Sequence, residues 1–388
     1  MTSVKGYEGI VLCAPVTIPY VRRSERSAQW FAGRAIAELL SIAGIRKDAL
    51  EGLSINSFTL APDSGISLAE HLGLGLRWLD QAPGGGASAI MGLRKAARAV
   101  ASGDAEIVAC VAFDVQDKAS FRDVVASFSR FAQDAVYPIA APGPSFFGAC
   151  VTSEYMRLTG ATAEDFGRIC IAQRQNALTN PYALLRTPVT LADYLASRMI
   201  CDPIRLLDCV MPCCGAEAFL VTTEQVARRQ GLPFAHLLST MERHNAFADD
   251  AIQLRGGWLL ERETFYSRAG RGPEEVDLLC TYDDYPVISL LQVEGLGFCG
   301  IGQGADFVRC RDLAVGGDFP VNTSGGQLSA GQAGSAGGAI GLVECLRQLT
   351  AQVLGSAVTD CRTAIASGFG MITYDRGMSC VAAMLAAA

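Results

Sequence analysis

The sequence has few histidines, and it has no long apolar run. Only three of its 388 residues are histidines, and none of these (His71, His236 and His244) lies near a cysteine or a pair of carboxylates. Each is therefore predicted to be structural or exposed rather than catalytic. No stretch reaches the roughly 18–20 consecutive apolar residues of a membrane span. The apolar run near the start is interrupted by Glu8 and two prolines, which predicts a cytoplasmic protein without a secretory signal.

Basic clusters and two common catalytic motifs are also missing. The formal net charge is −7, and the chain carries no stripe of lysines and arginines. This argues against nucleic acid or an anionic membrane as the main partner, because both are bound by clustered positive charge. The sequence contains neither G-x-S-x-G nor G-x-x-x-x-G-K-[ST], so the serine-hydrolase and phosphate-loop classes lose their usual motifs.

Cysteine is common, but its distribution does not indicate a metal site. The 14 cysteines are scattered singly through apolar runs, apart from the cluster CVMPCC at residues 209–214. A structural zinc site would need a second pair of cysteines or suitably spaced histidines. We therefore expect reduced, buried thiols and no metal.

The hydrophobic pattern alternates between strands and helices. This alternation predicts an α/β protein with parallel strands joined by crossover helices. Ser24 is a candidate N-cap and Gly44 a candidate stop for the first helix. The predicted strands are residues 8–15, 105–114, 217–223, 363–370 and 379–388, and the predicted helices are 24–44, 67–74, 84–103 and 335–352.

Two segments far apart in the chain resemble each other weakly. SAIMGLRKAARAV, at residues 88–100, and GAIGLVECLRQL, at 338–349, share small residues, a Gly-Leu pair and then a basic residue. This pattern indicates two copies of one strand–helix unit. The predicted halves are residues 1–224 and 225–388, with an inserted helical layer at about 115–206, since a structureless connection of that length is uncommon.

The segment GLGFCG, at residues 295–300, matches the dinucleotide fingerprint letter for letter. That fingerprint requires a strand before it and a helix after it. Here SLLQVE before it is helical in pattern, and IGQGADFV after it is not. We interpret Gly295 and Gly297 as a helix stop and a turn, and we expect no nucleotide cofactor.

Three segments together resemble one known family. NTSGGQLSAGQAGSAGG, at 322–338, resembles the thiolase loop N-x-S-G-G followed by G-H-P. CTYDDYPVISLLQVEGLGFCGIGQGADFV, at 280–308, is similar to the segment of sterol carrier protein X thiolases that begins H-D-x-F. Residues 84–114 resemble the thiolase nucleophile loop, helix and strand. The chain is identified as a thiolase-like protein of the lipid-transfer branch. The resemblance implies a homodimer and a thiolase fold: a duplicated five-layer αβαβα with an inserted helical loop domain.

The reactive residues of a thiolase are missing at the matching positions. The position of the nucleophilic cysteine falls on Gly86, and the histidine of G-H-P becomes Gln332. The second cysteine falls near Ile365 or Ala366, and the oxyanion-loop residue becomes Tyr282. Without a thiolate at this point no acyl-enzyme can form there.

The groups that remain suggest non-covalent chemistry. Tyr282 and Tyr374 lie on loops that the resemblance directs into one pocket, and we predict that they handle protons. Backbone N–H groups of glycine-rich turns can polarise a thioester carbonyl, with the Gln332 amide as a further donor. Ser88, two residues beyond the nucleophile position, is predicted to be a helix cap rather than a nucleophile. The candidate glycines are Gly85, Gly86, Gly325, Gly326 and Gly368.

Because it lacks the two catalytic cysteines, the chain resembles one branch of the family most, the thiolase-like acyl-CoA aldolases of steroid side-chain degradation. This resemblance implies retro-aldol cleavage of a β-hydroxyacyl-CoA, with a steroid or another lipid or aromatic side chain. The reaction needs no cofactor beyond the CoA thioester substrate. The resemblance implies a small accessory subunit with an OB-fold and a zinc ribbon. Two alternatives remain open: an acyltransferase or condensing subunit whose reactive group comes from another chain, and a non-catalytic acyl-CoA-binding scaffold of a thiolase complex.

Overall fold

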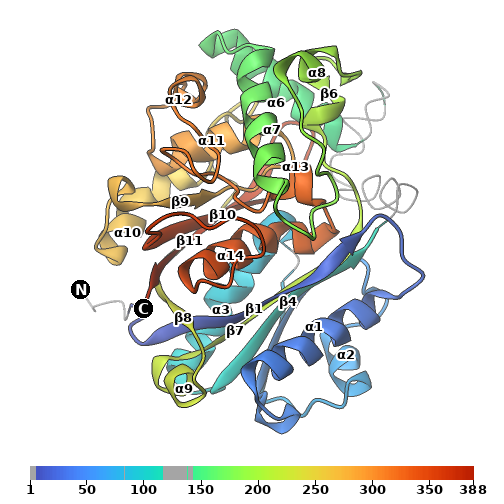
Figure 1. The fold of residues 1–388 in the computed structure, drawn as a ribbon, viewed down its shortest axis with the longest axis vertical. Helices are drawn as coiled ribbons and strands as arrows, with labels where there is room; N and C mark the ends of the chain where they lie inside the picture. Colours follow the sequence, from blue (N-terminus) through green and yellow to red (C-terminus); the bar gives the residue numbers. More distant parts are fainter. Residues whose placement is uncertain (1–5, 83, 117–137, 139–142) are drawn as a thin grey trace.

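The computed structural model describes residues 6–82, 84–116, 138 and 143–388, and its central feature is a nine-stranded mixed sheet (Figure 1). The strands are β1 (Ile10–Val21), β2 (Gly52–Asn56), β3 (Trp78–Gln81), β4 (Ile107–Val115), β7 (Cys214–Thr223), β8 (Phe234–His244), β9 (Leu278–Cys280), β10 (Thr363–Ile372) and β11 (Gly377–Ala387). Their order across the sheet is β3-β2-β4-β7-β1-β8-β11-β10-β9.

The pairing of the strands repeats along this order. From β1 outward, the pairs β1–β7 and β7–β4 are antiparallel, and the pairs β4–β2 and β2–β3 are parallel. From β8 outward, the pairs β8–β11 and β11–β10 are antiparallel, and the pair β10–β9 is parallel. A parallel bridge from Leu279 to Val321 stands where the fifth strand would be. The sequence predicts two copies of one unit, and this repetition is consistent with that; the duplication and the boundary between residues 224 and 225 stay predictions.

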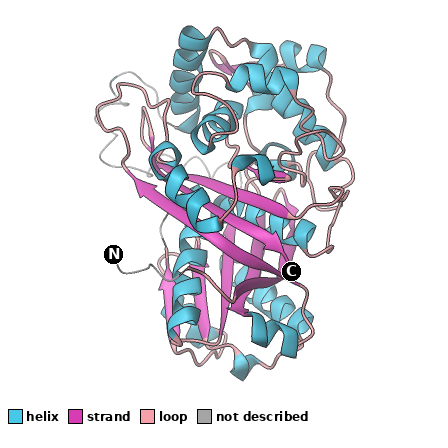
Figure 2. Cartoon of the chain, turned by 90° about the vertical axis from the view of Figure 1, so that its left-hand side faces the viewer, coloured by secondary structure: helices cyan, strands magenta, loops and turns pink. Residues whose placement is uncertain are grey.

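Helices lie between and outside the two parts of the sheet, β3-β2-β4-β7-β1 and β8-β11-β10-β9 (Figure 2). Helix α3 (Ser88–Ser102) packs against α14 (Gly337–Leu349) in the middle layer. Helices α1 (Ala28–Ala43) and α10 (Trp258–Ala269) cover the outer faces. Along β4 the side chains alternate, so that Val108 faces α3 and Ala109 faces α1, as expected for a strand buried on both faces. The fold is mixed α/β, and no described helix is long and apolar enough to span a bilayer.

Further helices gather at one end of the sheet (Figure 1). These helices are α6 (Pro144–Thr159), α7 (Ala163–Ala177), α8 (Leu191–Ala196), α11 (Pro286–Leu296), α12 (Gly304–Cys310) and α13 (Gly326–Ala330). Three of them, α6, α7 and α8, fall in the range of about 115–206 where the sequence predicts an inserted helical layer. That this layer is an insertion stays a prediction, and residues 117–137 and 139–142 lie outside the described part of the chain. Phe147 of α6 stacks on Phe369 of β10 with a centroid distance of 6.1 Å, and Trp258 of α10 stacks on the same ring at 5.7 Å.

Several local predictions are confirmed, and others are wrong. Gly44 ends α1 in the left-handed conformation, as expected, but the N-cap is Ser27 rather than Ser24. Strand β1 continues beyond residue 15 through both of its prolines, because two register shifts absorb them. Gly297 ends α11 in the left-handed conformation, whereas Gly295, the predicted helix stop, lies inside this helix. A helix, α12, does follow GLGFCG, contrary to the prediction, but a helix rather than a strand precedes this segment, so the dinucleotide fingerprint still lacks its context.

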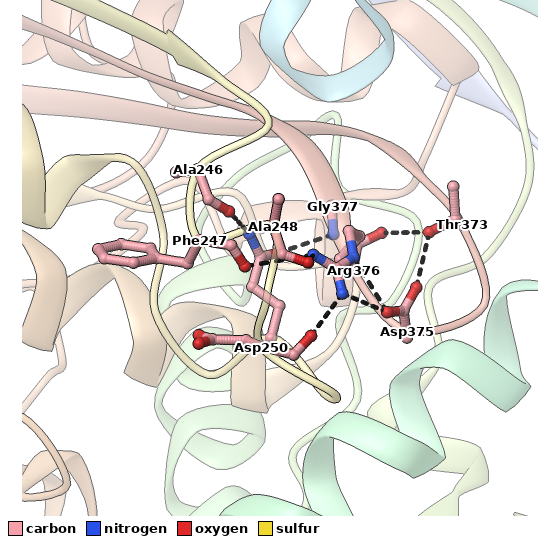
Figure 3. A network of polar contacts seen from close by, with 9 residues as sticks. Ala246, Phe247, Ala248, Asp250, Thr373, Asp375, Arg376 and Gly377 are labelled. Atoms are coloured by element: carbon pink, nitrogen blue, oxygen red, sulfur yellow. Dashed lines mark hydrogen bonds and ion pairs between the residues drawn. The ribbon is translucent and has the colours of Figure 1, made fainter.

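Arg376 fixes the turn between β10 and β11 to the segment after β8 (Figure 3). Its guanidinium donates to the carbonyl oxygens of Phe247, Ala248 and Asp250, at 3.2 and 3.0 Å for the first two. It also pairs with Asp375 at 2.6 Å, and both side chains are largely buried. One side chain therefore joins two loops that are more than 120 residues apart.

We expect Arg376→Ala to lower the free energy of unfolding by about 2–3 kcal/mol, because it leaves three carbonyls and a buried carboxylate without their charged partner. Urea denaturation measures the effect. Arg255→Ala is the matched control, because Arg255 pairs with Asp250 on the same segment but is 44% exposed, and we expect it to lose less than about 1 kcal/mol. Equal losses in the two variants would contradict this account of the turn.

Candidate active site

The candidate site lies where β9, β10 and the turn before α3 meet. Because β9 and β10 are parallel, the loop that follows β9 opens at the same edge of the sheet as the end of β10. The 3₁₀ turn η2 (Gly85–Ala87) packs against β10 at this edge. Tyr282, Gly86 and Gly368 are thereby brought together from three separate parts of the chain.

The Tyr282 ring fills the space beside Gly86. A methyl group placed on Gly86 would overlap the Tyr282 ring and the carbonyl oxygen of Phe369. Tyr282 is only 7% exposed, so its ring has little freedom to move aside. The position that the resemblance assigns to a nucleophilic cysteine therefore accepts no side chain here.

The backbone of Tyr282 is fixed in both directions by Gln292 of α11. The Tyr282 N–H donates to Gln292 Oε1 at 2.9 Å, and Gln292 Nε2 donates to the Tyr282 carbonyl at 2.7 Å. Ser367 of β10 also donates to Gln292 Oε1. Since all three residues are buried, this network fixes the backbone from which the phenol projects.

The Tyr282 hydroxyl donates to Asp284 Oδ2 at 2.8 Å. Burial, and then the charge of Asp284, raises the pKa of the phenol well above 10, while a hydrogen bond with Gln332 acts in the opposite direction. The phenol therefore keeps its proton at neutral pH. Burial also raises the pKa of Asp284 to about 7, against the opposing effect of the Tyr282 hydrogen bond.

Asp283 connects this loop to the glycine-rich segment. Its carboxylate accepts from the N–H groups of Gln327 and Leu328 at 3.0 and 3.2 Å, and burial raises its pKa to about 6. A methyl group on Gly326 would overlap this carboxylate, whereas Gly325 packs against Ala177 of α7. Gly326 thus contacts Asp283 of the site loop, whereas Gly325 faces α7.

Gln332 lies beside Tyr282; its predicted role as a further donor to the substrate stays a prediction. Its backbone is held by Met211 and Cys213, with N–O distances of 2.9 and 3.1 Å. Its Oε1 accepts from the Gly334 N–H at 3.2 Å. The side-chain NH₂ is the donor group of this amide, and its hydrogen bond with the Tyr282 hydroxyl acts to lower the pKa of the phenol.

Besides Gly325 and Gly326, the predicted site residues divide into two groups. Tyr282, Gln332, Gly85, Gly86 and Gly368 come together around the end of β10. Tyr374 lies on the turn after β10 and is 43% exposed, and no hydrogen bond among the described residues joins it to Tyr282. The pairing of the two phenols stays a prediction.

Sequence reasoning missed Asp283 and Asp284. Two adjacent carboxylates between the apolar segment LLC and the helix that begins at Pro286 were the available signal, because charged residues are rarely buried without a specific role. One of them caps α13 and the other binds the phenol, so the pair lies at the centre of the site.

Two further side chains near the site, Ser88 and Cys213, are not activated as nucleophiles. Ser88 is buried at the start of α3 and donates to the Gly85 carbonyl at 2.5 Å. Cys213 lies beside Gly331, but burial raises the pKa of its thiol, so it is not a thiolate at neutral pH. Among the described residues no group of three or more histidine, cysteine, aspartate or glutamate side chains could hold a metal ion.

Comparison with known proteins identifies the family. A family model described as thiolase C-terminal domain-like matches residues 262–382. A steroid side-chain-cleaving aldolase from Thermomonospora curvata is 31% identical over 331 residues, which cover 80% of this chain and 83% of the aldolase. This chain belongs to the thiolase superfamily, in its sterol carrier protein 2 and thiolase-like branch.

Other thiolase-like proteins agree with this placement. A 17-hydroxy-3-oxo-4-pregnene-20-carboxyl-CoA lyase from Mycobacterium tuberculosis is 31% identical over 352 residues, which cover 85% of this chain and 88% of the lyase. A solved Ltp2-ChsH2(DUF35) aldolase superposes with a TM-score of 0.81 at 27% identity, over 98% of both chains. A monomeric SCP2-thiolase-like protein from Mycobacterium smegmatis shares the fold, with a TM-score of 0.70 at 15% identity, over 98% of this chain and 78% of that one.

Proposed function

We propose that this thiolase-like chain is a carbon–carbon lyase that cleaves a β-hydroxyacyl-CoA into a shorter acyl-CoA and a ketone or aldehyde. The observation that carries the proposal is the Tyr282 ring packed against Gly86. Without room for a nucleophile there, an acyl-enzyme has no route at this position. Retro-aldol cleavage needs only a proton acceptor and a polarised carbonyl. The aldolase and the lyase that are 31% identical to the chain support this reaction class.

In this mechanism the thioester carbonyl accepts hydrogen bonds from backbone N–H groups of Gly85, Gly86 and Gly368 and from the Gln332 amide. These donors stabilise the enolate that forms as the bond between the α- and β-carbons breaks. Tyr282 meets the β-hydroxyl of the substrate. The neighbouring loop is shaped by two further glycines, Gly325 and Gly326.

The similar proteins suggest the substrate and the partner. A steroid side chain is the first candidate for the acyl group, with other lipid and aromatic acyl groups behind it. The Ltp2-ChsH2(DUF35) aldolase contains a second protein, and we propose that this chain likewise works as a homodimer with a small accessory subunit that binds acyl-CoA.

The test is turnover of a panel of β-hydroxyacyl-CoA thioesters, with and without a DUF35-type subunit, followed by mass spectrometry. We expect a shorter acyl-CoA, a carbonyl product and no mass added to the protein. An acyl adduct on the chain would instead identify an acyltransferase or condensing subunit. Tight binding of acyl-CoA without turnover under every condition would identify a scaffold.

A further inference from the structure

Four tyrosine hydroxyls in the described part of the chain donate to mainly buried carboxylates. Three of these pairs hold the fold together, and the fourth lies in the candidate site. The pairs are Tyr20 with Glu217, Tyr155 with Glu294, Tyr194 with Asp208, and Tyr282 with Asp284.

Both oxygens of each structural carboxylate are used. Glu217 accepts from Tyr20 on one oxygen and from Thr17 on the other, each at 2.7 Å. Asp208 accepts from Tyr194 at 2.7 Å and from the Arg205 N–H at 2.8 Å. A carboxylate that is satisfied on both oxygens is an anchor, because a further proton or ligand would have to displace a bond.

Glu294 follows the same rule. One of its oxygens accepts from Tyr155 and from the Gly304 N–H, and the other accepts from the Gly302 N–H at 2.8 Å. It fixes the loop between α11 and α12. Its role is therefore accounted for by the fold.

Asp284 differs from the other three carboxylates. Its Oδ2 accepts from Tyr282, but its Oδ1 is shielded from solvent and has no hydrogen-bond partner among the described residues. A buried acceptor without a partner is unfavourable by about 1–3 kcal/mol, and a catalytic role is one of the explanations for such a group. The Tyr282 phenol, which is hydrogen-bonded to Asp284, packs against Gly86. The carboxylate with the unpaired Oδ1 is therefore one hydrogen bond away from the proposed reaction centre.

We propose that Asp284 is the proton-accepting partner of Tyr282, so that the phenol passes a proton from the substrate to the carboxylate and back again. This inference rests on the proposed function and adds the destination of the proton. The β-hydroxyl proton moves to the Tyr282 oxygen as the phenol proton moves to Asp284. The bond between the α- and β-carbons breaks, the β-oxygen forms a carbonyl, and the electron pair enters the thioester enolate. The proton then returns through Tyr282 to the α-carbon, so nothing is oxidised and no water is consumed.

The ionisable surroundings of Asp284 suit this role. Burial has the largest effect on its pKa, Tyr282 lowers it and Asp283 raises it, and no cation in the described part of the chain shifts it. Tyr285 lies close enough to feel its charge. With a pKa of about 7, Asp284 can both accept and return a proton near neutral pH. The phenol alone cannot be the base, because it holds its own proton too firmly.

Two reactions test the relay separately from the overall cleavage. One is turnover of the β-hydroxyacyl-CoA that the panel identifies. The other is exchange of the α-hydrogens of propanoyl-CoA in D₂O, which uses the proton relay without breaking a carbon–carbon bond. We expect wild type to catalyse both, with rates that fall as pH drops below about 7 because Asp284 takes up a proton.

Asp284→Asn is expected to lower both rates by on the order of 10²-fold or more. The fall in rate below about pH 7 is also expected to disappear in this variant. Asp284→Glu keeps a carboxylate, so it is expected to be faster than Asp284→Asn and again to lose rate as the pH falls. Glu217→Gln is the matched control, since Glu217 is also buried and bonded to a tyrosine, and we expect wild-type rates from it.

The relay is overturned if wild type shows no exchange, if its exchange rate does not fall in acid, or if Asp284→Asn keeps the wild-type rate and pH profile. The wild-type pH profile decides the matter even if the variant fails to fold. Exchange that depends on Asp284, without cleavage of any hydroxyacyl-CoA, would refute the proposed lyase reaction and leave the relay standing.

Discussion

Tyr282→Phe is expected to lower kcat for carbon–carbon cleavage by about 10²–10⁴-fold, the usual contribution of a positioned proton-transfer group. Phenylalanine keeps the ring that fills the space beside Gly86, so the shape of the site is preserved. The change removes only the hydroxyl that connects the substrate to Asp284. Because the proposed role of this hydroxyl is proton transfer, KM is expected to change by less than about threefold.

The same variant is expected to lose some stability. Without the phenol, neither oxygen of Asp284 has a partner among the described residues, which lowers the free energy of unfolding by about 1–3 kcal/mol. Steady-state kinetics and urea denaturation on the same preparation separate the two effects. A fully folded Tyr282→Phe protein with wild-type kcat would exclude the phenol from the reaction.

Two further tyrosines serve as controls for this experiment. Tyr285 is buried on the same loop, and its hydroxyl makes a long bond of 3.4 Å to Ser145, so Tyr285→Phe is expected to stay within about tenfold of wild type. Tyr374→Phe tests the pairing predicted from the sequence. A loss comparable to that of Tyr282→Phe supports the pair of phenols, whereas full activity leaves Tyr282 to act with Asp284.

Local chemistry explains which features could be predicted from the sequence. Gly44 and Gly103 end their helices in the left-handed conformation, and glycine signals this wherever the chain folds. The alternation of apolar strands and helices likewise reports on neighbouring residues. Gly86 and Gln332 were recognisable because a family pattern surrounds them, and the structure brings both to Tyr282.

Features that depend on distant contacts could not be predicted in this way. The importance of Asp284 depends on its burial and on an oxygen without a partner among the described residues, and both arise from how loops far apart in the chain pack together. The exposure of Tyr374 depends on the turn that Arg376 fixes to residues 247–250. Strand β1 runs past its prolines because neighbouring strands accept its register shifts. In each case the decisive partner lies far away in the sequence.

Gly86→Cys is expected to destabilise the protein and not to restore a thiolase. The new side chain would overlap the Tyr282 ring and the Phe369 carbonyl, and overpacking against a held ring lowers the free energy of unfolding by about 3 kcal/mol or more. The thiol would also lack a base, because Gln332 stands where the thiolase histidine would be. Incubation of this variant with an acyl-CoA is expected to leave no acyl group on the introduced thiol, as mass spectrometry would show.

A double-mutant cycle separates the steric effect from other consequences of losing Gly86. If the Tyr282 ring is an obstacle, Gly86→Ala is expected to be less destabilising in a Tyr282→Ala background than in wild type, while the overlap with the Phe369 carbonyl remains in both. Gly75→Ala is the control, because a methyl group there meets no atom within 4 Å, and we expect a change below about 0.5 kcal/mol. Additive effects of the two substitutions would mean that the ring does not close this position. The absence of a nucleophile would then have no steric cause in Tyr282, and the argument for non-covalent cleavage would depend on the phenol and Asp284 alone.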